Sequence, residues 1–400
     1  MSRASWALAL LLALVGSTPS DAQILTEQRF LEDSLESHPG VAVAEADVAA
    51  ATGVSRQTGV IDNPEIAWER EDPDGAPRQD TWRLSWRLPF DGRRHRIAAG
   101  EAAVAASVSE VEAARLTARL EMRSLYASWY IATEREKVLL ENLDRTRDLA
   151  DWLRARAEEG EAAGVEARRL DLEVEVLQRN AAAARAEAQA RREAAAVWSK
   201  MVTGKVSPAR PTLPAPPETA DVDDRADLEA LAHRVVLAES VTQVRGRVVE
   251  PPAISVGWLE IRDGLQSFDG PVFGVTWPLP LFNRNQGNSE AAAAGLERAN
   301  SELELSRRRA EQHLQAALAS YTDLYEPAMN DGDRTANADV LDAVFAAFEA
   351  GEASLTDMLD ALRATVGVEL ARLETLARAL HAQLELEAAL GRPILSGENS

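Results

Sequence analysis

The chain has 400 residues, of which 46% are hydrophobic and 27% charged, values typical of globular proteins. Its 43 basic and 65 acidic residues give a net charge of -22, which argues against a nucleic-acid partner. It contains no cysteine, so neither a disulfide framework nor a lipid-acylated cysteine is available. Most charges lie in segments rich in Glu, Arg and Ala, where a solvated helix face is the usual explanation, so charge alone does not identify a transported ion.

The first 22 residues have the pattern of a secretory signal. Arg3 precedes an apolar run at 6–15, and small residues up to Ala22 stand where a signal peptidase cleaves. We therefore predict a signal peptide over 1–22 and an exported mature chain. No later stretch approaches the roughly 18 uninterrupted apolar residues of a membrane helix, so we expect no helical membrane anchor.

Two segments before residue 90 alternate between apolar and polar residues, the pattern of half-exposed strands. They are 65–70 and 81–89, and a turn-rich stretch joins them, so we predict a β-hairpin over 64–90. The face opposite the apolar one carries Arg83 and Arg87, which suits a water-filled interior better than a protein core.

A long helical hairpin is predicted over 95–200, because no proline occurs between Pro89 and Pro208. Apolar residues recur at spacings of three and four from about 95 to 158, which indicates one amphipathic helix. Some 60 helical residues would be roughly 90 Å long, far beyond the diameter of a compact domain. After a glycine-containing turn, a return helix completes an antiparallel coiled-coil pair.

The segment over 203–224 contains five prolines and is predicted to be an irregular linker. Beyond it we expect a second β-hairpin over 253–281, with strands at 253–261 and 272–281 and a loop at 262–270. Each predicted hairpin is preceded by a helix.

A second long helical hairpin is predicted over 288–390. Pro327 and the turn residues at 331–333 interrupt its first arm, so we expect a kink or a short break there. The remaining residues, 392–400, form a C-terminal tail.

The order of these elements repeats at an offset of 191 residues. Tryptophan and strand-ending proline are scarce enough for their coincidence at this offset to be informative. The sequence therefore predicts two structural repeats, 23–202 and 225–391. The matched pairs include Trp86 with Trp277, Pro89 with Pro280, Tyr130 with Tyr321, and Gly160 with Gly351.

Five of the nine tryptophans fall within the predicted strands, as an aromatic girdle at a membrane interface requires. Four strands cannot close a membrane barrel, because the smallest known barrels have about eight. Several chains would each have to contribute four. A soluble sheet packed on a helix is the competing interpretation. The five tryptophans are Trp68, Trp82, Trp86, Trp258 and Trp277.

No pattern in the sequence indicates catalysis, a cofactor or a metal site. The histidines have no zinc-ligand spacing, and we find neither a phosphate-binding glycine loop nor a nucleophile elbow. We expect each histidine to be a surface or packing residue. They are His38, His95, His233, His313 and His381.

Several segments resemble the TolC-type outer-membrane efflux factors. They fall in the order of that family and span nearly all of the mature chain. The run at 278–287, PLPLFNRNQG, is most similar to the CzcC-like branch, which serves heavy-metal efflux. The other segments are 38–40, 63–65, 88–94 (LPFDGRR) and 348–360 (FEAGEASLTDMLD).

The resemblance implies a mainly α protein with a small β portion. Four strands per chain would contribute to a twelve-stranded β-barrel in the outer membrane of a Gram-negative bacterium, formed by a homotrimer. The long antiparallel coiled-coil hairpins would form an α-barrel in the periplasm. A periplasmic membrane-fusion adaptor and an inner-membrane RND pump would be its partners, together with outer-membrane lipid. The expected function is a passive exit duct, possessing no enzymatic activity.

Family members carry carboxylates around the periplasmic aperture, and the resemblance assigns that place to Asp357 and Asp360. Their spacing puts both on one helix face. The alternative is a helix N-terminus capped by Ser354, with Asp357 three residues later. Both roles are compatible. Where relatives close the aperture with a tyrosine and an arginine, this chain has Phe348 and Ala353.

The two turns between the helix arms are the predicted contacts for the adaptor. Glycine can reverse the chain in both turns whether or not an adaptor binds. The residues concerned are Gly160, Glu161, Gly351 and Glu352.

Two other functions stay open at the level of sequence. One is an exit duct for type I secretion or multidrug efflux, built on the same fold. The other is a soluble periplasmic coiled-coil adaptor, in which the strands would form a small sandwich. The resemblance favours the metal-efflux duct over both.

Overall fold

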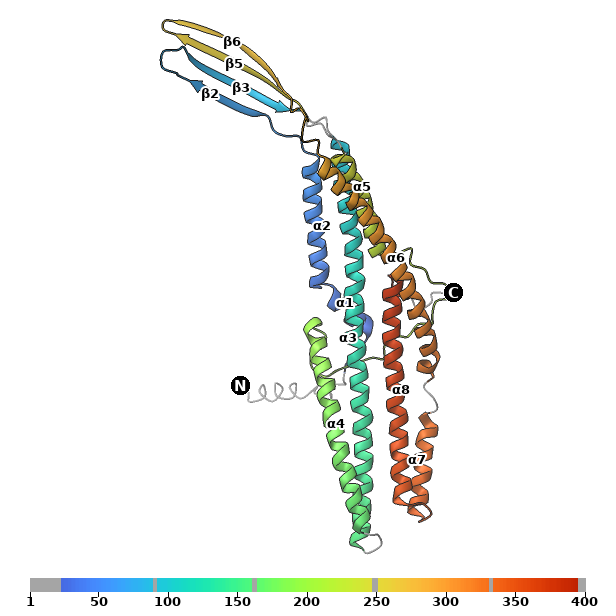
Figure 1. Ribbon diagram of the computed structural model, residues 1–400. Coiled ribbons are helices and arrows are strands. Elements are labelled where there is room, and N and C mark those ends of the chain that lie inside the picture. Colours follow the sequence, from blue (N-terminus) through green and yellow to red (C-terminus); the bar gives the residue numbers. More distant parts are fainter. Residues whose placement is uncertain (1–22, 89–91, 160–163, 247–250, 331–333, 395–400) are drawn as a thin grey trace, which may run out of the picture. The chain divides into compact units, whose positions relative to one another are not determined.

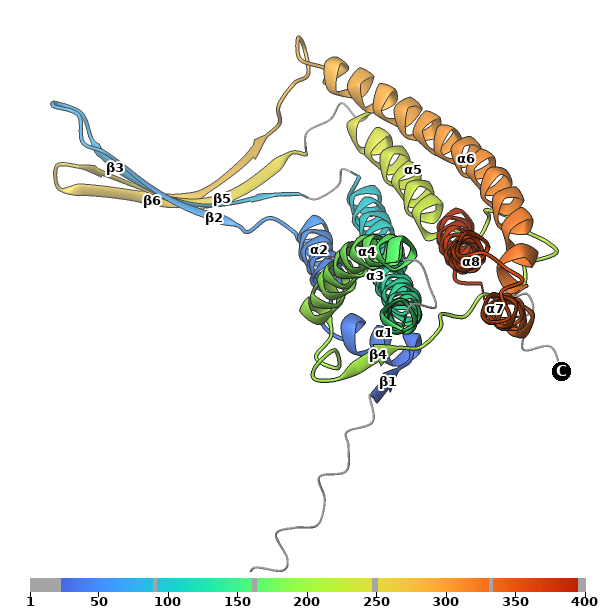
Figure 2. The same ribbon diagram turned by 90° about the horizontal axis from the view of Figure 1, so that it is seen from below.

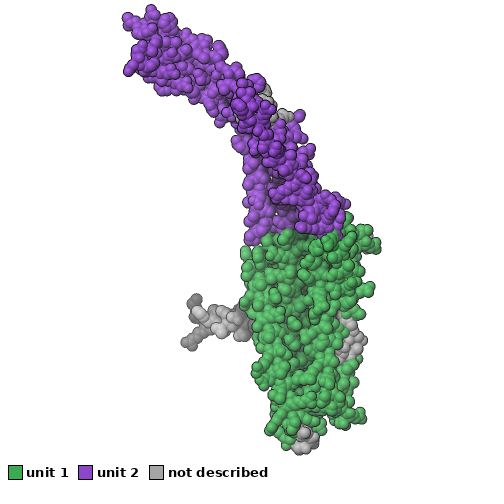
Figure 3. Space-filling view, in the orientation of Figure 1, with its two compact units in different colours: residues 1–38, 116–221, 312–400 green, residues 39–115, 222–311 purple. Residues whose placement is uncertain are grey.

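The computed structural model describes residues 23–88, 92–159, 164–246, 251–330 and 334–394, with the backbone alone described for 334–338. The predicted signal peptide therefore lies outside the described residues. The chain divides into two compact units, each built from parts of both predicted repeats (Figure 3). Among the described helices, none combines the length and the apolar composition needed to cross a membrane. Unit 1 comprises 1–38, 116–221 and 312–400, and unit 2 comprises 39–115 and 222–311.

The four strands of unit 2 form one antiparallel sheet in the order β2-β3-β5-β6 (Figure 1). Its strands are β2 (Glu65–Glu71), β3 (Arg78–Arg87), β5 (Ala253–Asp263) and β6 (Gln266–Thr276). The two predicted hairpins are present, and β3 pairs with β5 to join them into one sheet. Both outer strands, β2 and β6, have one edge without a partner strand in the described chain.

The second hairpin begins at Ala253 as predicted, but the predicted loop was too long at both ends and the predicted end of the second strand was too late. A loop was expected over 262–270, but the strands continue to Asp263 and from Gln266, and the chain reverses at Gly264 and Leu265. Gly264 adopts φ +56°, which favours glycine. Polar residues interrupt the apolar alternation here, yet backbone pairing does not depend on them. β6 ends at Thr276, so Trp277 lies just beyond the strand.

Paired residues lie on the same face of the sheet, so the register separates its two faces. One face carries a row of Trp68, Trp82, Trp258 and Pro271, and the Trp68 and Trp82 rings are 5.9 Å apart. Two further apolar rows follow on that face, and the large side chains in them are exposed. They contain Ile66, Leu84, Val256 and Phe273, then Trp86, Ile254 and Val275. Arg83 and Arg87 lie on the opposite face.

Helices complete unit 2. They are α2 (Pro39–Thr58), α5 (Ala226–Arg245) and the first parts of α3 (Arg93–Glu158) and α6 (Gln286–Met329). Arg115 of α3 pairs with Glu45 of α2 at 2.9 Å. A Cβ at Gly100 would lie 2.7 Å from the Ser55 hydroxyl oxygen, so glycine permits the close approach of α2 and α3.

Unit 1 contains the remaining helices. They are α1 (Glu27–Leu35), the rest of α3 and α6, α4 (Gly164–Trp198), α7 (Arg334–Glu349) and α8 (Leu355–Leu390). Figures 1 and 2 both show α4 beside α3 and α7 beside α8, the two antiparallel pairs expected from the sequence. The first arm of the second pair is broken, because α6 passes Pro327, ends at Met329, and α7 begins at Arg334.

A short parallel pair of strands was not predicted. β1 (Gln23–Leu25) pairs with β4 (Val206–Pro208), which lies within the proline-rich segment. The Tyr126 hydroxyl lies 2.7 Å from the Leu25 carbonyl oxygen and 2.9 Å from that of Ala209. The Tyr321 hydroxyl donates to the Pro214 carbonyl. Two buried tyrosines, one from α3 and one from α6, therefore hold the proline-rich segment in place.

Candidate functional site

The ends of four helices meet in one apolar cluster at the turn end of unit 1. α3 contributes Leu149 and Leu153, and α4 contributes Leu170, which is fully buried. Since the two helical hairpins share this core, burial of apolar side chains holds the ends of their helices side by side. α7 contributes Leu341, and α8 contributes Leu355, Met358, Leu359 and Leu362.

The turn between α7 and α8 is built by backbone and capping hydrogen bonds. Gly351 has φ +77°, and its N–H donates to the Phe348 carbonyl at 3.0 Å. Ser354 then caps α8: its hydroxyl oxygen accepts from the Asp357 N–H at 3.2 Å, and the Asp357 carboxylate accepts from the Ser354 N–H at 2.9 Å. This is a capping box, so the capping role expected for these two residues is confirmed.

The capping geometry changes the chemistry of Asp357. Its carboxylate also accepts a hydrogen bond from the Ser354 hydroxyl at 2.7 Å. The hydroxyl and then the backbone N–H of Ser354 hold the pKa of Asp357 below its ordinary value, because both bonds favour the charged carboxylate. Asp357 is exposed to solvent and negatively charged at neutral pH.

Asp360 lies one turn further along α8 and belongs to a polar contact between α8 and α4. The Arg363 guanidinium lies 3.8 Å from Asp360 and donates to Glu173 of α4 at 2.6 and 3.2 Å. Arg169 of α4 donates to the Thr356 hydroxyl at 3.1 Å. These contacts, which were not predicted, join the two helical hairpins across their outer surface.

Phe348 packs against an aromatic side chain of α3. Its ring lies 5.7 Å from that of Trp152 on α3, and Phe345 lies 6.1 Å from the same indole. These three aromatic side chains therefore join α7 to α3. Gly351 and Glu352 lie in the described turn, whereas the predicted tip residues Gly160 and Glu161 lie outside the described residues.

A charged cluster is buried in unit 1 away from the turns. Arg123 of α3 donates to Glu27 of α1 at 2.6 Å and also to Glu387 of α8, whose side chain is fully buried. Burial disfavours the charged guanidinium, but Glu387 and Glu27 outweigh it and raise the pKa of Arg123. One arginine therefore links three helices.

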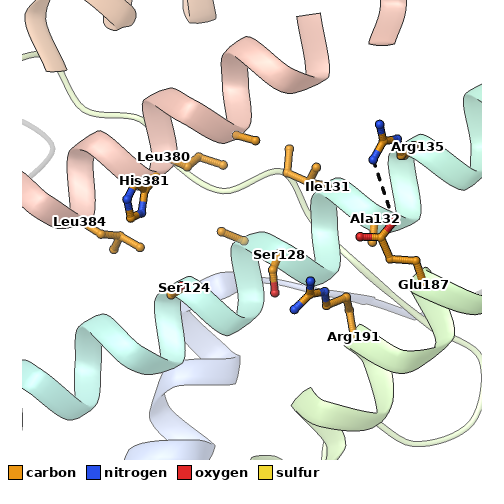
Figure 4. A pocket seen from close by; sticks show the side chains of 12 residues that line it. Ser124, Ser128, Ile131, Ala132, Arg135, Glu187, Arg191, Leu380, His381 and Leu384 are labelled. Carbon is orange, nitrogen blue, oxygen red and sulfur yellow. Dashed lines mark ion pairs between the residues drawn. The ribbon is translucent and has the colours of Figure 1, made fainter. Parts of the chain in front are cut away.

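A cavity of about 270 Å³ lies where α4 and α8 flank α3 (Figure 4). Arg135 and Glu187, 3.9 Å apart, bridge α3 and α4 beside it. His381 lines the cavity and lies 3.8 Å from Glu385, whose other oxygen is 3.2 Å from His313. Across the described part of the chain, no group of three or more His, Asp or Glu side chains is arranged to hold a metal ion.

Comparison with known proteins finds a matching family and two relatives. Residues 30–197 match the family described as outer membrane efflux protein. The chain is 25% identical over 386 residues to the cobalt-zinc-cadmium resistance protein CzcC of Cupriavidus metallidurans, covering 92% of this chain and 90% of that protein. It is 28% identical over 309 residues to the nickel-cobalt-cadmium resistance protein NccC of Alcaligenes xylosoxydans xylosoxydans, covering 74% of this chain and 70% of that protein.

The family match covers most of the first predicted repeat, and the similarity to the two resistance proteins extends into the second. The solved structure of the outer membrane protein VceC from Vibrio cholerae matches this chain with a TM-score of 0.73 at 17% identity, covering 92% of this chain and 96% of VceC. The fold expected from the sequence is thus confirmed. The relatives are channels and resistance proteins rather than enzymes.

The structure groups some of the predicted residues and separates others. Asp357 and Asp360 lie in the first turns of α8, close to Gly351 and Glu352 in the preceding turn. Four of the five predicted tryptophans lie on one face of the sheet, and Trp277 follows it. The α4–α8 contacts and the buried Arg123 cluster had no sequence signal, because their members are far apart in the chain.

Proposed function

We propose that this protein is the outer-membrane exit duct of a tripartite system that removes divalent heavy-metal cations. The supporting observation is similarity along almost the full length, 92% of the chain, to a protein named for cobalt, zinc and cadmium resistance. A second relative is named for nickel, cobalt and cadmium resistance. The duct is passive, and transport is driven by an inner-membrane RND pump through a periplasmic adaptor.

The proposed assembly is a homotrimer. Each sheet has two unpaired edges, which a neighbouring copy can cover by strand pairing. Three sheets of four strands would close a barrel of twelve, above the minimum of about eight. The exposed apolar face would contact lipid, and the face with Arg83 and Arg87 would line the water-filled interior.

Within this assembly we propose that Asp357 and Asp360 surround the periplasmic aperture. Both carboxylates are solvent-exposed in the first turns of α8, and three copies would form a ring of negative charge. Such a ring attracts cations and repels anions at a constriction. The capping bonds of Asp357 leave its charge in place, so capping and cation attraction operate together.

Replacing both carboxylates tests this ring. In D357N/D360N, each amide keeps an acceptor oxygen for the helix turn while the charge is removed. We expect the cation preference of the channel to fall, measured as the reversal potential in a salt gradient across a planar bilayer. D144N/D148N removes the same charge from an exposed face of α3 and should leave the potential unchanged. Equal shifts in both variants would contradict the aperture assignment.

We further propose that the turns bearing Gly351 and Glu352, and Gly160 and Glu161, contact the adaptor. The support is their position at the ends of the helical hairpins, where α7 gives way to α8 and α3 to α4.

Gene deletion tests the substrate class. Loss of the duct should lower tolerance to zinc, cobalt, cadmium and nickel salts, and the wild-type gene should restore it. Tolerance to a panel of organic drugs is the control. Unchanged metal tolerance in the deletion strain would exclude the metal assignment, and a loss confined to drugs would favour the multidrug alternative.

A further inference from the structure

A band of charge crosses the sheet beyond its tryptophan row. Arg70, Asp80, Glu260 and Asp269 are paired in that order across the four strands. They lie two residues along each strand from Trp68, Trp82, Trp258 and Pro271, and therefore on the same apolar face. Arg78 and Arg262 pair with each other in the next row of that face.

The position of this band follows from the chain path. The helices join the sheet at Glu65, Arg87, Ala253 and Thr276, whereas the hairpin turns lie at the opposite end. With the helices in the periplasm, the turn end is the outer surface of the membrane. Tryptophan rings occupy the membrane–water interface of barrel proteins. The charged row lies two residues, or about 7 Å, beyond the tryptophan row along each strand, so the band reaches the outer-leaflet headgroups.

The charges within the band are unequally satisfied. Asp80 is largely buried and forms ion pairs with two arginines, Arg70 at 2.7 Å and Arg78 at 3.3 Å. The Arg78 Nε, the atom of this 3.3 Å ion pair, makes no hydrogen bond in the described chain. Arg262 pairs with Glu260 at 2.7 Å and lies directly opposite Arg78.

Two arginines directly opposite each other on one face repel, and an anion between them removes that repulsion. Arg70 lies on the neighbouring strand β2, with its guanidinium 4.9 Å from the centre of the Trp68 ring. Its side chain and that of Arg262 are 44% and 55% exposed, so both can reach a ligand. Glu260 and Asp269 repel anions from the β6 side, which limits the surface to β2, β3 and β5.

We propose that Arg70, Arg78 and Arg262 bind the phosphate groups of an outer-leaflet glycolipid of the lipid A type. The proposal rests on the membrane position given under the proposed function, but not on the transported cation. Guanidinium groups donate paired N–H bonds to phosphate oxygens, and the lipid chains would lie over the exposed apolar rows below. The occupant is thus a lipid whose headgroup and chains match adjacent parts of one face.

The test compares two lipids on the purified full-length protein in detergent. Lipid A with its phosphates and the same lipid after dephosphorylation are titrated, and binding is followed by native mass spectrometry. We expect the phosphorylated form to bind about tenfold more tightly or better, as two or more charge-assisted hydrogen bonds would give. R70Q/R78Q/R262Q should remove this preference.

R83Q/R87Q is the matched control, because Arg83 and Arg87 lie on β3 but on the opposite face. It should keep the preference for phosphate. If the triple variant misfolds, R262Q alone provides the test, since it changes one exposed side chain and should reduce the preference several-fold. Equal binding of both lipids, equal losses in control and test variants, or binding of inorganic phosphate as tight as that of the lipid would each overturn the proposal.

Discussion

Glu387 has a fully buried side chain in unit 1, where it accepts hydrogen bonds from Arg123 and Gln383. Replacing it by alanine leaves the Arg123 guanidinium buried with Glu27 as its remaining carboxylate partner. A buried charge that loses a partner typically costs about 3 to 5 kcal/mol, so we expect E387A to lower the free energy of unfolding by roughly that amount. Thermal unfolding followed by circular dichroism measures the loss.

Glu385 provides the control for this prediction. It lies two residues away on α8 with a half-exposed side chain that contacts His313 and His381. E385A should change stability by less than about 1 kcal/mol, because exposed ion pairs contribute little. Similar losses in the two variants would show that burial of the Arg123 cluster is not the cause.

The capping box at the start of α8 gives a prediction about pH. The pKa of Asp357 is lowered from its ordinary 3.8 by the hydroxyl and N–H of Ser354. The stabilisation of the folded state by the charged Asp357 carboxylate is therefore present above pH 3.8 and is lost as pH falls through the lowered pKa. In S354A the pKa of Asp357 should rise toward 3.8, which a carboxyl NMR titration would detect.

Thr356 is the control for Ser354, because its hydroxyl accepts from Arg169 rather than bonding to Asp357. T356A should leave the titration of Asp357 unchanged. An unaltered pKa in S354A would mean that the capping bonds do not determine it.

At the scale of elements, the helices were the more predictable part. The absence of proline over more than a hundred residues and the regular apolar spacing indicated α3 and α4, and Pro327 with its polar neighbours indicated the break before α7. The strands were less predictable near their turns. Asp263 and Asp269 looked like loop residues, but they lie in paired strands. β1 and β4 have three residues each, too few for any periodicity.

The candidate site was predictable only where its signal is local. Ser354 and Asp357 are three residues apart, so their capping bonds could be anticipated from spacing. Arg363 and Glu173 are separated by 190 positions, and their contact depends on how α8 packs against α4. Residue type alone does not reveal such a pairing.

The tyrosine contacts with the proline-rich segment can be tested together. Y126F/Y321F removes hydroxyls that lie against the carbonyls of Leu25, Ala209 and Pro214. Each lost bond should cost about 1 kcal/mol, so the segment should open more often. We expect faster cleavage within 203–224 in limited proteolysis, read by mass spectrometry. Y325F, which changes the neighbouring half-buried ring, should be cleaved at the wild-type rate.

At the scale of the whole molecule, trimer formation predicts strand pairing between β6 of one copy and β2 of the next. The chain lacks cysteine, so introduced pairs can be read without background. Ile66 and Phe273 lie on the apolar face of their strands, whereas Gly274 lies on the other. In a scan that combines I66C with cysteine at 271, 273 or 275, at least one pair should give cross-linked dimers and trimers on oxidation.

I66C/G274C is the control, since a disulfide cannot join side chains on opposite faces of a sheet. Cross-linking to trimers in a same-face variant but not in this control supports edge-to-edge closure. Monomers in every same-face variant would contradict it.

The two hairpins of the sheet end in short turns, at 72–77 and at Gly264 and Leu265. In the proposed orientation these turns are what the strands present to the outside of the cell. An antibody or a bacteriophage would find few residues to recognise there, and surface proteases few to cut. A bacterium could therefore carry many copies of this duct while offering little of it as a target.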